Sequence, residues 1–417
     1  MSLLALLLGL SVGARAQQGW SPSWATLPES LQFRREARPQ EPPFDPDAAP
    51  EPDPPATADD EEGAPRRFAT APLSYSGARR LSPSEYPAFS DDLDAASLAR
   101  AAEQSDRYWS ALGDLTAVSI GGRRYTVGDL RASARALVRL ARRGAVALQA
   151  EVPARFDVFE SVAPEVVFTA YYEPQIDATL TPDAAHPMPI YERPRELLDD
   201  GGGDFSCRFL VKRRGRIRFA EKPCWTRAQI DRGALAGRHL ELAWASAPDV
   251  FDLQLEGSGT LLIGGVRRKL GYDSANGRPF RSAERALRDG GGIPDGAEFF
   301  EFIRGLPTAR QLDILEKNPR YTFFHDVPPD QDGPTGALGT PLTAGRSLAV
   351  SDQMPRGLPA FIDVAGIRRL AFAQDAGKAI SDPGRADLFW GGGPRAGAEA
   401  RRFKHPGRLF FLVLKQP

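Results

Sequence analysis

The sequence predicts a mainly β protein built around a small barrel. Six short apolar segments fall within the last hundred residues, and turns containing glycine or proline separate them. Few segments after residue 150 show the apolar spacing of a helix. The chain has 417 residues, enough for two domains or for one domain with a large insertion.

Residues 1–16 have the pattern of a secretory signal peptide, although the basic segment that usually begins one is missing. The apolar run Leu3–Leu10 is followed by small residues and the cleavage pattern Ala14-Arg-Ala16. This run is too short to span a bilayer. No cysteine directly follows the cleavage point, so the sequence offers no lipid attachment site there. We therefore expect an exported protein that is soluble or peripherally associated with a membrane.

Residues 17–72 are predicted to be a disordered, extended linker. Proline and acidic residues dominate from Pro22 to Pro72, and no apolar periodicity is present. Such a segment cannot bury enough apolar surface to offset the entropy cost of ordering.

Export bears on the two cysteines, Cys207 and Cys224. An oxidising compartment permits a disulfide between them. The alternative is two unpaired thiols, and the spacing does not choose between these states.

Two amphipathic helices are expected after Leu73, where folded structure should begin. Ser90 is placed to cap the first. Its apolar stripe consists of Leu98, Ala102, Trp109 and Leu112. The second helix buries Leu130, Ala134, Leu137, Leu140 and Ala141 and carries Arg131, Arg135, Arg139 and Arg143 outward. We interpret this arginine stripe as a solvated face.

Short strands and hairpins are expected up to residue 310. Gly121-Gly122 and Gly264-Gly265 mark hairpins, and 166–172 reads as a strand. Alternating apolar residues over 251–255 predict a half-buried strand that ends at Glu256-Gly-Ser-Gly259. Further on, Thr308 and Gln311 resemble a capping box before a short helix.

The strands expected in the last hundred residues are Tyr321–Phe324, Arg346–Val350, Ala360–Val364, Arg369–Ala373, Ala386–Trp390 and Leu409–Leu414.

Two aspartates near the C-terminus are the first candidates for chemistry. Asp375 and Asp387 lie in runs of small and apolar residues, and Gly391–Gly393 follow the second run. A carboxyl group held against apolar walls loses hydration, which raises its pKa and suits a general acid. The alternative is that both aspartates cap turns.

Aromatic residues near these acids are candidates for carbohydrate binding, because flat rings cover the apolar faces of sugars. They are Tyr171, Tyr172, Tyr321, Phe389 and Trp390. The alternative for each is a place in the core, and it is weakest for Tyr172, at the expected strand end.

Several other activities are not expected. The net charge of −1 gives no indication of nucleic-acid binding, and none of the four histidines lies at metal-ligand spacing. Glycines at 201–203 and 291–293 lack a nucleotide-binding context. Ser258 is not in a Gly-x-Ser-x-Gly pattern and has no obvious histidine base, so we do not expect a nucleophile there. The glycines around it are expected to let the backbone approach a sugar chain.

A series of motifs between residues 75 and 417 is highly specific when taken together. These are Ala170-Tyr-Tyr-Glu-Pro174, Pro189-Ile-Tyr191, Glu256-Gly-Ser-Gly259, Gly271-Tyr-Asp-Ser-Ala-Asn-Gly277, Asn318-Pro-Arg-Tyr-Thr-Phe-Phe324, Gly336-Ala-Leu-Gly-Thr-Pro-Leu342, Asp375–Ile380 and Arg385–Gly391. In this order they resemble the membrane-bound lytic transglycosylase A (MltA) family, with its C-terminal 3D, or three-aspartate, domain.

The resemblance implies a double-psi β-barrel with some flanking helices, split between residues 73–174 and 311–417. A smaller β-rich domain, residues 175–310, is inserted between them, and a groove for peptidoglycan lies between the two domains. The resemblance also implies the periplasm of the Gram-negative envelope. The expected partners are peptidoglycan glycan strands, with cell-wall synthesis or remodelling proteins as further candidates, and the expected state is a monomer.

The resemblance also implies the site. Asp387 matches the family's catalytic aspartate, Asp375 matches a second aspartate of the motif, and Asp352 lies near the third. Substrate contacts are assigned to Tyr172, Glu173, Glu256, Gly257, Ser258, Gly259, Asp352, Phe389 and Trp390. No metal or organic cofactor is required.

The chain departs from the family pattern in several places. Glu256 stands where glutamine is usual, Lys378 replaces a glycine, the loop 381–384 differs, and the segment 396–405 is rich in arginine. A carboxylate at 256 accepts hydrogen bonds from sugar hydroxyls but donates none unless it is protonated.

The implied reaction breaks the bond between MurNAc and GlcNAc, with the sugar's own C6 hydroxyl as nucleophile. As a hypothesis, one acid serves twice: Asp387 donates a proton to the glycosidic oxygen and then takes one from the C6 hydroxyl. Two alternatives stay open. One is a non-catalytic glycan-binding module, and the other is a hydrolase that uses water with an acid such as Asp375 as base.

Overall fold

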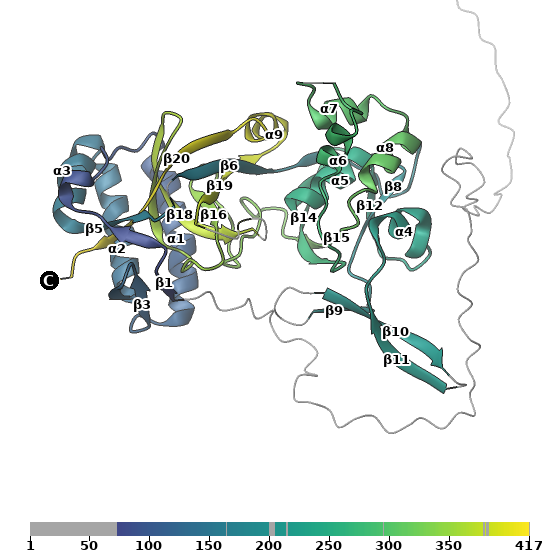
Figure 1. Cartoon of the computed structure of the whole chain (residues 1–417), viewed down its shortest axis with the longest axis horizontal. Coiled ribbons are helices and arrows are strands. Elements are labelled where there is room, and N and C mark those ends of the chain that lie inside the picture. Colours follow the sequence, from purple (N-terminus) through teal and green to yellow (C-terminus); the bar gives the residue numbers. More distant parts are fainter. Residues whose placement is uncertain are drawn as a thin grey trace, which may run out of the picture. The chain divides into compact units, whose positions relative to one another are not determined.

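The computed structural model describes residues 73–163, 165–199, 205–213, 216–294, 296–377, 380 and 383–416 (Figure 1). The predicted signal peptide and linker lie outside the described residues. Residues 201–203, Lys378 and part of the loop 381–384 lie outside them as well.

A closed six-stranded barrel forms the centre of the fold. Its strands are β6 (Val166–Glu173), β16 (Ser347–Val350), β17 (Pro359–Val364), β18 (Ile367–Ala376), β19 (Arg385–Gly392) and β20 (Lys404–Leu414). They follow the order β17-β18-β16-β19-β6-β20, and β20 pairs with β17 to close the barrel. The pairs β16–β18 and β19–β6 are parallel, and the others are antiparallel. The prediction of a mainly β protein with a barrel split in the sequence is confirmed.

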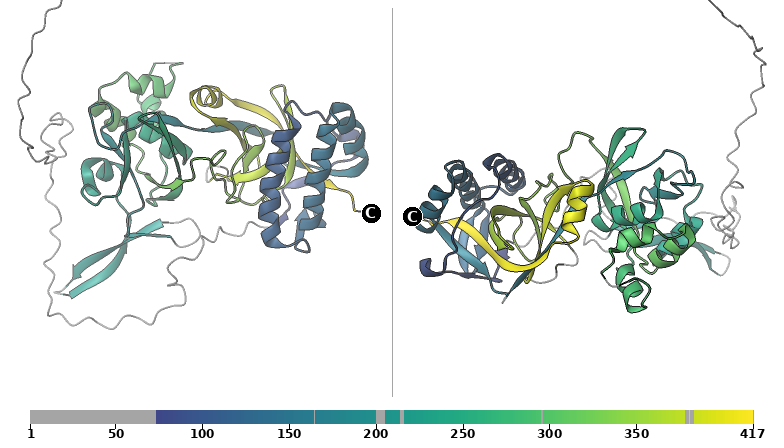
Figure 2. Two further views of the ribbon diagram at one scale, coloured as in Figure 1. Left: turned by 180° about the vertical axis from the view of Figure 1, so that it is seen from behind. Right: turned by 90° about the horizontal axis from the view of Figure 1, so that it is seen from above.

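Helices and a small sheet extend the barrel on one side. These elements are β1 (Ser74–Tyr75), β2 (Ala78–Arg80), α1 (Ala95–Leu112), β3 (Ala117–Ile120), β4 (Arg123–Thr126), α2 (Val127–Arg142), α3 (Ala145–Arg155) and β5 (Phe156–Ser161). Helices α1 and α2 pack against each other and against barrel strands (Figure 2). One apolar core, which includes Trp109, Leu137, Phe361 and Phe410, joins them to the barrel.

Both helical predictions are confirmed, with one correction at the first cap. The residue that caps α1 is Asp94, whose carboxylate accepts a hydrogen bond from the Ser97 backbone N–H at 2.8 Å. Ser90 lies four residues earlier, outside the helix. The predicted hairpin at Gly121-Gly122 is confirmed by β3 and β4. In the arginine stripe, Arg131 is largely covered and pairs with Asp106 of α1 at 2.8 Å.

The segment inserted after β6 contains three small sheets. Their strands are β7 (Gln175–Asp177), β8 (Met188–Tyr191), β9 (Leu197–Asp199), β10 (Phe205–Arg213), β11 (Arg216–Lys222), β12 (Glu241–Ala245), β13 (Gly259–Ile263), β14 (Val266–Ala275) and β15 (Thr322–Val327). The largest sheet has the order β15-β14-β13-β7. Strand β15 lies beyond the predicted boundary at residue 310, yet it pairs with β14 and not with a barrel strand.

Helices cover these sheets. They are α4 (Arg227–Gln229), α5 (Ala247–Glu256), α6 (Ala283–Asp289), α7 (Phe299–Arg304) and α8 (Thr308–Leu315). A second apolar core, which includes Leu253, Leu261 and Phe299, lies between α5, α7 and the four-stranded sheet. Cys207 and Cys224 form a disulfide, with an S–S distance of 2.08 Å.

The strand predicted over 251–255 is wrong, because these residues belong to helix α5. Ser246 caps the helix start by accepting from the Asp249 N–H, and Gly257 ends it with a φ of +80°. The start and stop signals of a helix therefore outweigh a short apolar alternation. The helix predicted at Thr308 is confirmed as α8, but Pro307 precedes it. The Gln311 side chain donates to backbone carbonyl oxygens instead of forming a capping box.

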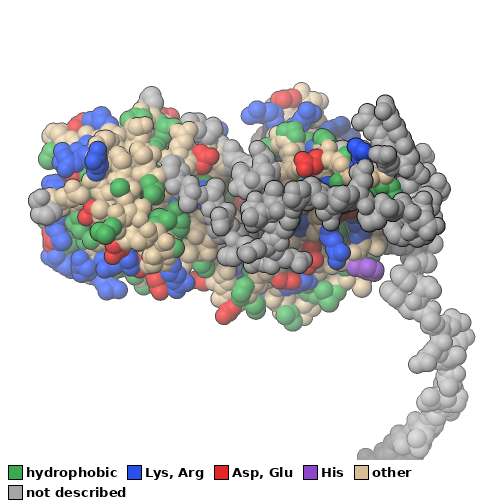
Figure 3. Space-filling view, turned by 90° about the horizontal axis from the view of Figure 1, so that it is seen from below, with side chains coloured by type: hydrophobic (Ala, Val, Ile, Leu, Met, Phe, Trp, Pro, Cys, Tyr) green, Lys and Arg blue, Asp and Glu red, His purple; other side chains and the backbone are tan. Residues whose placement is uncertain are grey.

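On the face drawn in Figure 3, lysine and arginine side chains are interspersed with acidic and apolar ones. Among the described residues, no helix is both long enough and apolar enough to cross a membrane.

Candidate active site

Strand register places the two predicted acids in one row across the barrel wall. Asp375 on β18 is the partner of Ala349 on β16, and Ala349 is the partner of Asp387 on β19. Thr169 on β6 follows Asp387 in the same row. Neighbouring strands lie about 4.8 Å apart, so the two aspartate backbones are about 10 Å apart. Ala349 between them is buried, and the Tyr171 side chain reaches from β6 to Asp375.

Asp387 is held by a cation and a hydroxyl group. The Arg385 guanidinium contacts both carboxylate oxygens, from Nε to Oδ1 and from Nη2 to Oδ2, each at 3.0 Å. Thr169 donates its hydroxyl hydrogen to Oδ1. The Asp387 side chain is 17% exposed, and that of Arg385 is 38% exposed. The acid is therefore sheltered, while its cation reaches solvent.

Asp375 receives three hydrogen bonds. The Tyr171 hydroxyl donates to Oδ2 at 2.9 Å, and the backbone N–H groups of Ala337 and Ala376 donate to Oδ1 at 2.8 and 2.9 Å. Burial raises the pKa of Asp375 above its usual range, although these donors act in the opposite direction. Asp375 is thus fixed in position, with both oxygens occupied.

Tyr171 lies among three carboxyl groups. Burial raises its pKa well above the usual value, and the charges of Asp375, Asp387 and Glu256 all add to that shift. Its ring packs against Phe389 with centroids 5.4 Å apart. Tyr171 therefore stays protonated at the centre of the acid cluster, which we define as Asp375, Asp387 and Glu256.

Glu256 is the last residue of α5 and is half-buried. The backbone N–H of Tyr172 donates to its Oε2 at 3.3 Å. Burial, followed by the charge of Asp252, raises the pKa of Glu256 to about 8. The charges of Arg401 and Asp387 also act on it, in opposite directions.

A cavity of about 880 Å³ extends from Glu256 along α7. Its lining residues are Glu256, Glu284, Arg288, Gly296, Ala297, Glu298, Phe299, Phe300, Glu301, Phe302, Arg401 and Arg402. Its lining thus combines charged groups of both signs with three aromatic rings.

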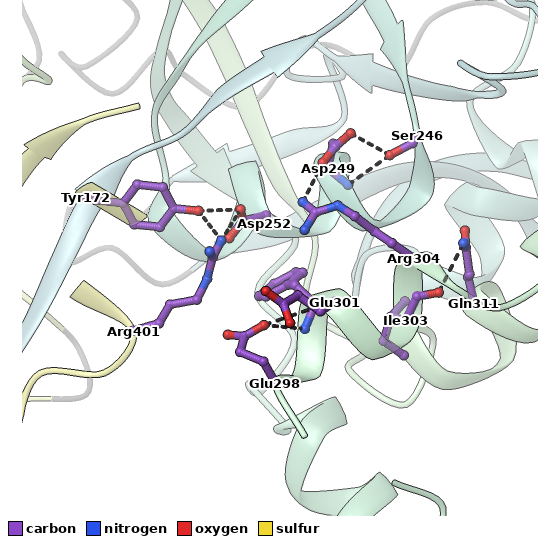
Figure 4. A network of polar contacts seen from close by, with 11 residues as sticks. Tyr172, Ser246, Asp249, Asp252, Glu298, Glu301, Ile303, Arg304, Gln311 and Arg401 are labelled. Carbon is purple, nitrogen blue, oxygen red and sulfur yellow. Dashed lines mark hydrogen bonds and ion pairs between the residues drawn. The ribbon is translucent and has the colours of Figure 1, made fainter. Parts of the chain in front are cut away.

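Tyr172 belongs to a buried network that joins the barrel to α5 (Figure 4). The Tyr172 hydroxyl donates to Asp252, and Arg401 contacts Asp252 Oδ2 at 2.7 Å. The Arg401 guanidinium lies over the rings of Tyr172 and Phe300, at 4.9 and 4.8 Å from their centroids. With only 4% of its surface exposed, Tyr172 holds two segments together and does not present its ring to solvent.

Glu173 has a similar structural position. Its carboxylate lies 3.1 Å from Lys269 Nζ of β14, and both side chains are buried. The ion pair fastens the end of β6 to the four-stranded sheet.

The other residues predicted to contact substrate do not form one surface. Ser258 is buried, and Gly259 is packed so closely that an added Cβ would lie 3.0 Å from the Pro174 carbonyl oxygen. Asp352 is exposed in the turn after β16. Phe389 is buried against Tyr171. Trp390 is half-buried, and its indole N–H donates to Glu399 at 2.8 Å.

Four residues of this region were assigned no role in the site from the sequence: Thr169, Arg385, Asp252 and Arg401. Arg385 carried a usable signal, because residues two apart on a strand share a face. The other three are brought in by strand pairing or by tertiary contacts. Among the described residues, no group of three or more His, Cys, Asp or Glu side chains is arranged to hold a metal ion.

These observations define a class of protein: a split six-stranded barrel with two aspartates on its wall and a β-rich insertion that follows β6 directly. The family model described as the MltA specific insert domain matches residues 167–325, and the 3D domain model matches residues 346–413. The chain belongs to the MltA family.

Two relatives are named membrane-bound lytic murein transglycosylase A. The protein from Vibrio cholerae is 28% identical over 270 residues, which are 60% of this chain and 66% of the relative. The protein from Escherichia coli K12 is 29% identical over 267 residues, 59% of this chain and 65% of the relative. The matched stretch thus spans slightly less than two thirds of these relatives.

Solved structures show the same fold. A membrane-bound lytic murein transglycosylase from Agrobacterium tumefaciens is 27% identical, with a TM-score of 0.62 over 81% of this chain and 98% of that one. The lytic transglycosylase LtgG of Burkholderia pseudomallei is 28% identical, with a TM-score of 0.52 over 83% and 98%. E. coli MltA with bound chitohexaose has a TM-score of 0.64 over 84% and 98%, at 22% identity.

Proposed function

We propose that this protein is a lytic transglycosylase of peptidoglycan. It cleaves the β-1,4 bond between MurNAc and GlcNAc and leaves a 1,6-anhydro-MurNAc end. The observation that carries the proposal is the register row in which Asp375, Ala349 and Asp387 lie side by side. It puts a sheltered acid, Asp387, near a second carboxyl group on the architecture of the MltA family.

Asp387 is the acid and base in this proposal. It protonates the glycosidic oxygen, and its carboxylate then takes the proton of the C6 hydroxyl as that oxygen closes on C1. The N-acetyl carbonyl stabilises C1 between these steps, as in substrate-assisted cases. An oriented intramolecular nucleophile replaces a diffusing water, and this supplies much of the rate.

Arg385 adds a requirement that the sequence did not suggest. An arginine within ion-pair distance favours the charged form of a carboxyl group. The acid step therefore requires the guanidinium to move aside when the glycan binds, and its exposure permits this movement. The returning cation then stabilises the carboxylate that the first proton transfer leaves.

Asp375 positions Tyr171 and the neighbouring backbone, because its oxygens are already occupied by three donors. Glu256 is a proposed glycan contact, since it is partly accessible within the acid cluster. Trp390, three residues after Asp387 on β19, is a second one because its ring is only half-buried. We propose structural roles for Tyr172 and Glu173.

Hydrolysis of the same bond is the second candidate. Inverting hydrolases hold two carboxyl groups roughly 6.5–9.5 Å apart to leave room for a water, and the row spacing of Asp375 and Asp387 is near this range. The occupied oxygens of Asp375 argue against its use as a base.

The products decide between the two reactions. The protein is incubated with purified sacculi, and the soluble muropeptides are analysed by mass spectrometry. The proposal predicts anhydro-muropeptides. Hydrolysis predicts products heavier by one water, about 18 Da, and a binding module releases no soluble product.

We place this reaction in the periplasm of a Gram-negative envelope, where peptidoglycan lies, with a monomer acting on glycan strands. The relatives' names support an envelope location. Cell fractionation and light scattering test these two assignments.

A further inference from the structure

Glu256 is the one member of the acid cluster whose chemistry the proposed mechanism does not use. It ends α5 at the point where Gly257 turns the chain, and it reaches back to the Tyr172 N–H of the barrel. It also lines the cavity along α7. Its carboxyl group therefore faces a ligand held in that cavity, and it lies close enough to Asp387 for the charge of Asp387 to act on it.

The arginines near Glu256 form ion pairs with other acids. Arg385 contacts both oxygens of Asp387, and Arg401 pairs with Asp252. Asp252 lies one helical turn before Glu256 on α5, so two like charges would face the same side of the helix. Within the part of the chain that the structure describes, Glu256 forms no ion pair.

The groups that face Glu256 come from several elements. Asp252 lies on α5, Tyr171 and Tyr172 on β6, Asp387 on β19, and Arg401 directly after α9 (Pro394–Ala400). Five further charged residues of α6, α7 and the segments beside them and beside α9 line the same cavity: Glu284, Arg288, Glu298, Glu301 and Arg402. An ionised Glu256 would thus lie beside Asp252 and Asp387, and Arg401, the cation whose charge acts on Glu256, is already paired with Asp252.

We propose that Glu256 works in its protonated form, as a neutral donor of a hydrogen bond to a glycan oxygen beside Asp387, and that losing this proton limits activity in alkaline solution. A protonated carboxyl group presents one O–H donor and one acceptor oxygen, the same pair that an amide side chain presents. The raised pKa of Glu256, about 8, agrees with this assignment. The inference rests on the proposed function.

The first test is the pH dependence of kcat/KM for release of muropeptides from sacculi, from pH 5 to 10. The wild-type rate should fall by about tenfold per pH unit above roughly pH 8, as one essential proton is lost. Glu256→Gln keeps the donor at every pH. It should retain wild-type activity at pH 7 within a few-fold, and its decline should move up by at least about one pH unit. Glu103→Gln, an exposed change on α1, is the matched control and should leave the profile unchanged.

The second test needs no turnover. Protein labelled with carbon-13 at the glutamate side-chain carboxyl is titrated by NMR. One resonance should titrate near pH 8 in wild type and in Glu103→Gln, and it should be missing from Glu256→Gln. Because wild-type protein alone supplies the signal, misfolding of a variant does not remove the test.

Two results would overturn the proposal. One is a Glu256→Gln profile that superimposes on wild type, together with no glutamate titrating above about pH 7. The other is a loss of activity by orders of magnitude in Glu256→Gln at pH 7. That loss would mean that Glu256 transfers its proton to the substrate and does not merely donate a hydrogen bond. Failure of the proposed function looks different, since wild type would then release no anhydro-muropeptides at any pH.

Discussion

Glu256 and Asp387 share a cluster, but their nearest partners differ. Asp387 has a bidentate arginine and a threonine hydroxyl, whereas Glu256 has one long hydrogen bond from a backbone N–H. Partners that donate to a carboxylate favour its charged form, and burial without a cation favours the neutral form. The surroundings of Glu256 therefore favour its neutral form, in agreement with its raised pKa.

The neutral state of Glu256 predicts how stability depends on pH. Its pKa in the folded protein, about 8, lies above the value of about 4.3 expected in the unfolded chain. Between these values the folded state binds more protons, so the free energy of unfolding falls as pH rises through this window. Glu256→Gln should match wild type near pH 4 and exceed it at pH 8 by on the order of 2 kcal/mol, allowing for solvent screening.

Urea denaturation of both proteins at pH 4.5, 6 and 8 measures this difference. Glu103→Gln should track wild type at all three. A constant offset between wild type and Glu256→Gln across the range would show that Glu256 is charged in the folded protein or that the substitution disturbs packing.

The sequence pattern indicated Asp375 and Asp387 but not their partners. Runs of small and apolar residues around each aspartate indicated strands, and the strands exist. The register that brings Thr169 beside Asp387 depends on pairing between residues 218 positions apart, which no local pattern reports. Tyr172 was assigned to a sugar because it ends a strand, but tertiary contacts cover its ring.

At the scale of elements, helix α5 joins the barrel to the inserted segment. Asp252 on its buried side receives the Tyr172 hydroxyl hydrogen and the Arg401 guanidinium, and Glu256 at its end accepts from β6. The apolar alternation over 251–255 led to the prediction of a strand in place of this helix. Its cap at Ser246 and its stop at Gly257 are the signals that would have identified it.

Removing the Arg401 cation should weaken this junction strongly. The Asp252 side chain is only 4% exposed, so Arg401→Met leaves a buried charge without its partner. Such a change costs on the order of 3–5 kcal/mol. In the double variant Arg401→Met/Asp252→Asn much of the loss should return, because the charge that needed the arginine is gone. Arg402→Met, at the exposed neighbour, is the control.

Urea denaturation of the four proteins at pH 7 gives the coupling free energy between Arg401 and Asp252. If Arg401→Met unfolds within about 0.5 kcal/mol of wild type, or if the double variant is simply the sum of the single ones, the junction does not depend on this pair.

For the whole molecule, the barrel is assembled from distant parts of the chain. Strand β6 lies between β19 and β20, and β7 starts two residues after β6 ends. The inserted segment therefore begins at the barrel wall that carries the acid cluster. Short strands and turn residues predicted a small barrel, and the family resemblance implied that it is split in the sequence. The place of β15 in the other sheet follows from its pairing with β14 and could not be read from its own residues.

Replacing Asp387 by asparagine is the most direct test of the central claim, that this side chain moves the proton in both halves of the reaction. Asparagine keeps the shape and removes the transferable proton. Release of anhydro-muropeptides from sacculi by Asp387→Asn should fall by orders of magnitude, while Asp352→Asn, in the exposed turn after β16, should act like wild type. Turnover by Asp387→Asn close to the wild-type rate, in protein that is folded by circular dichroism, would contradict the account.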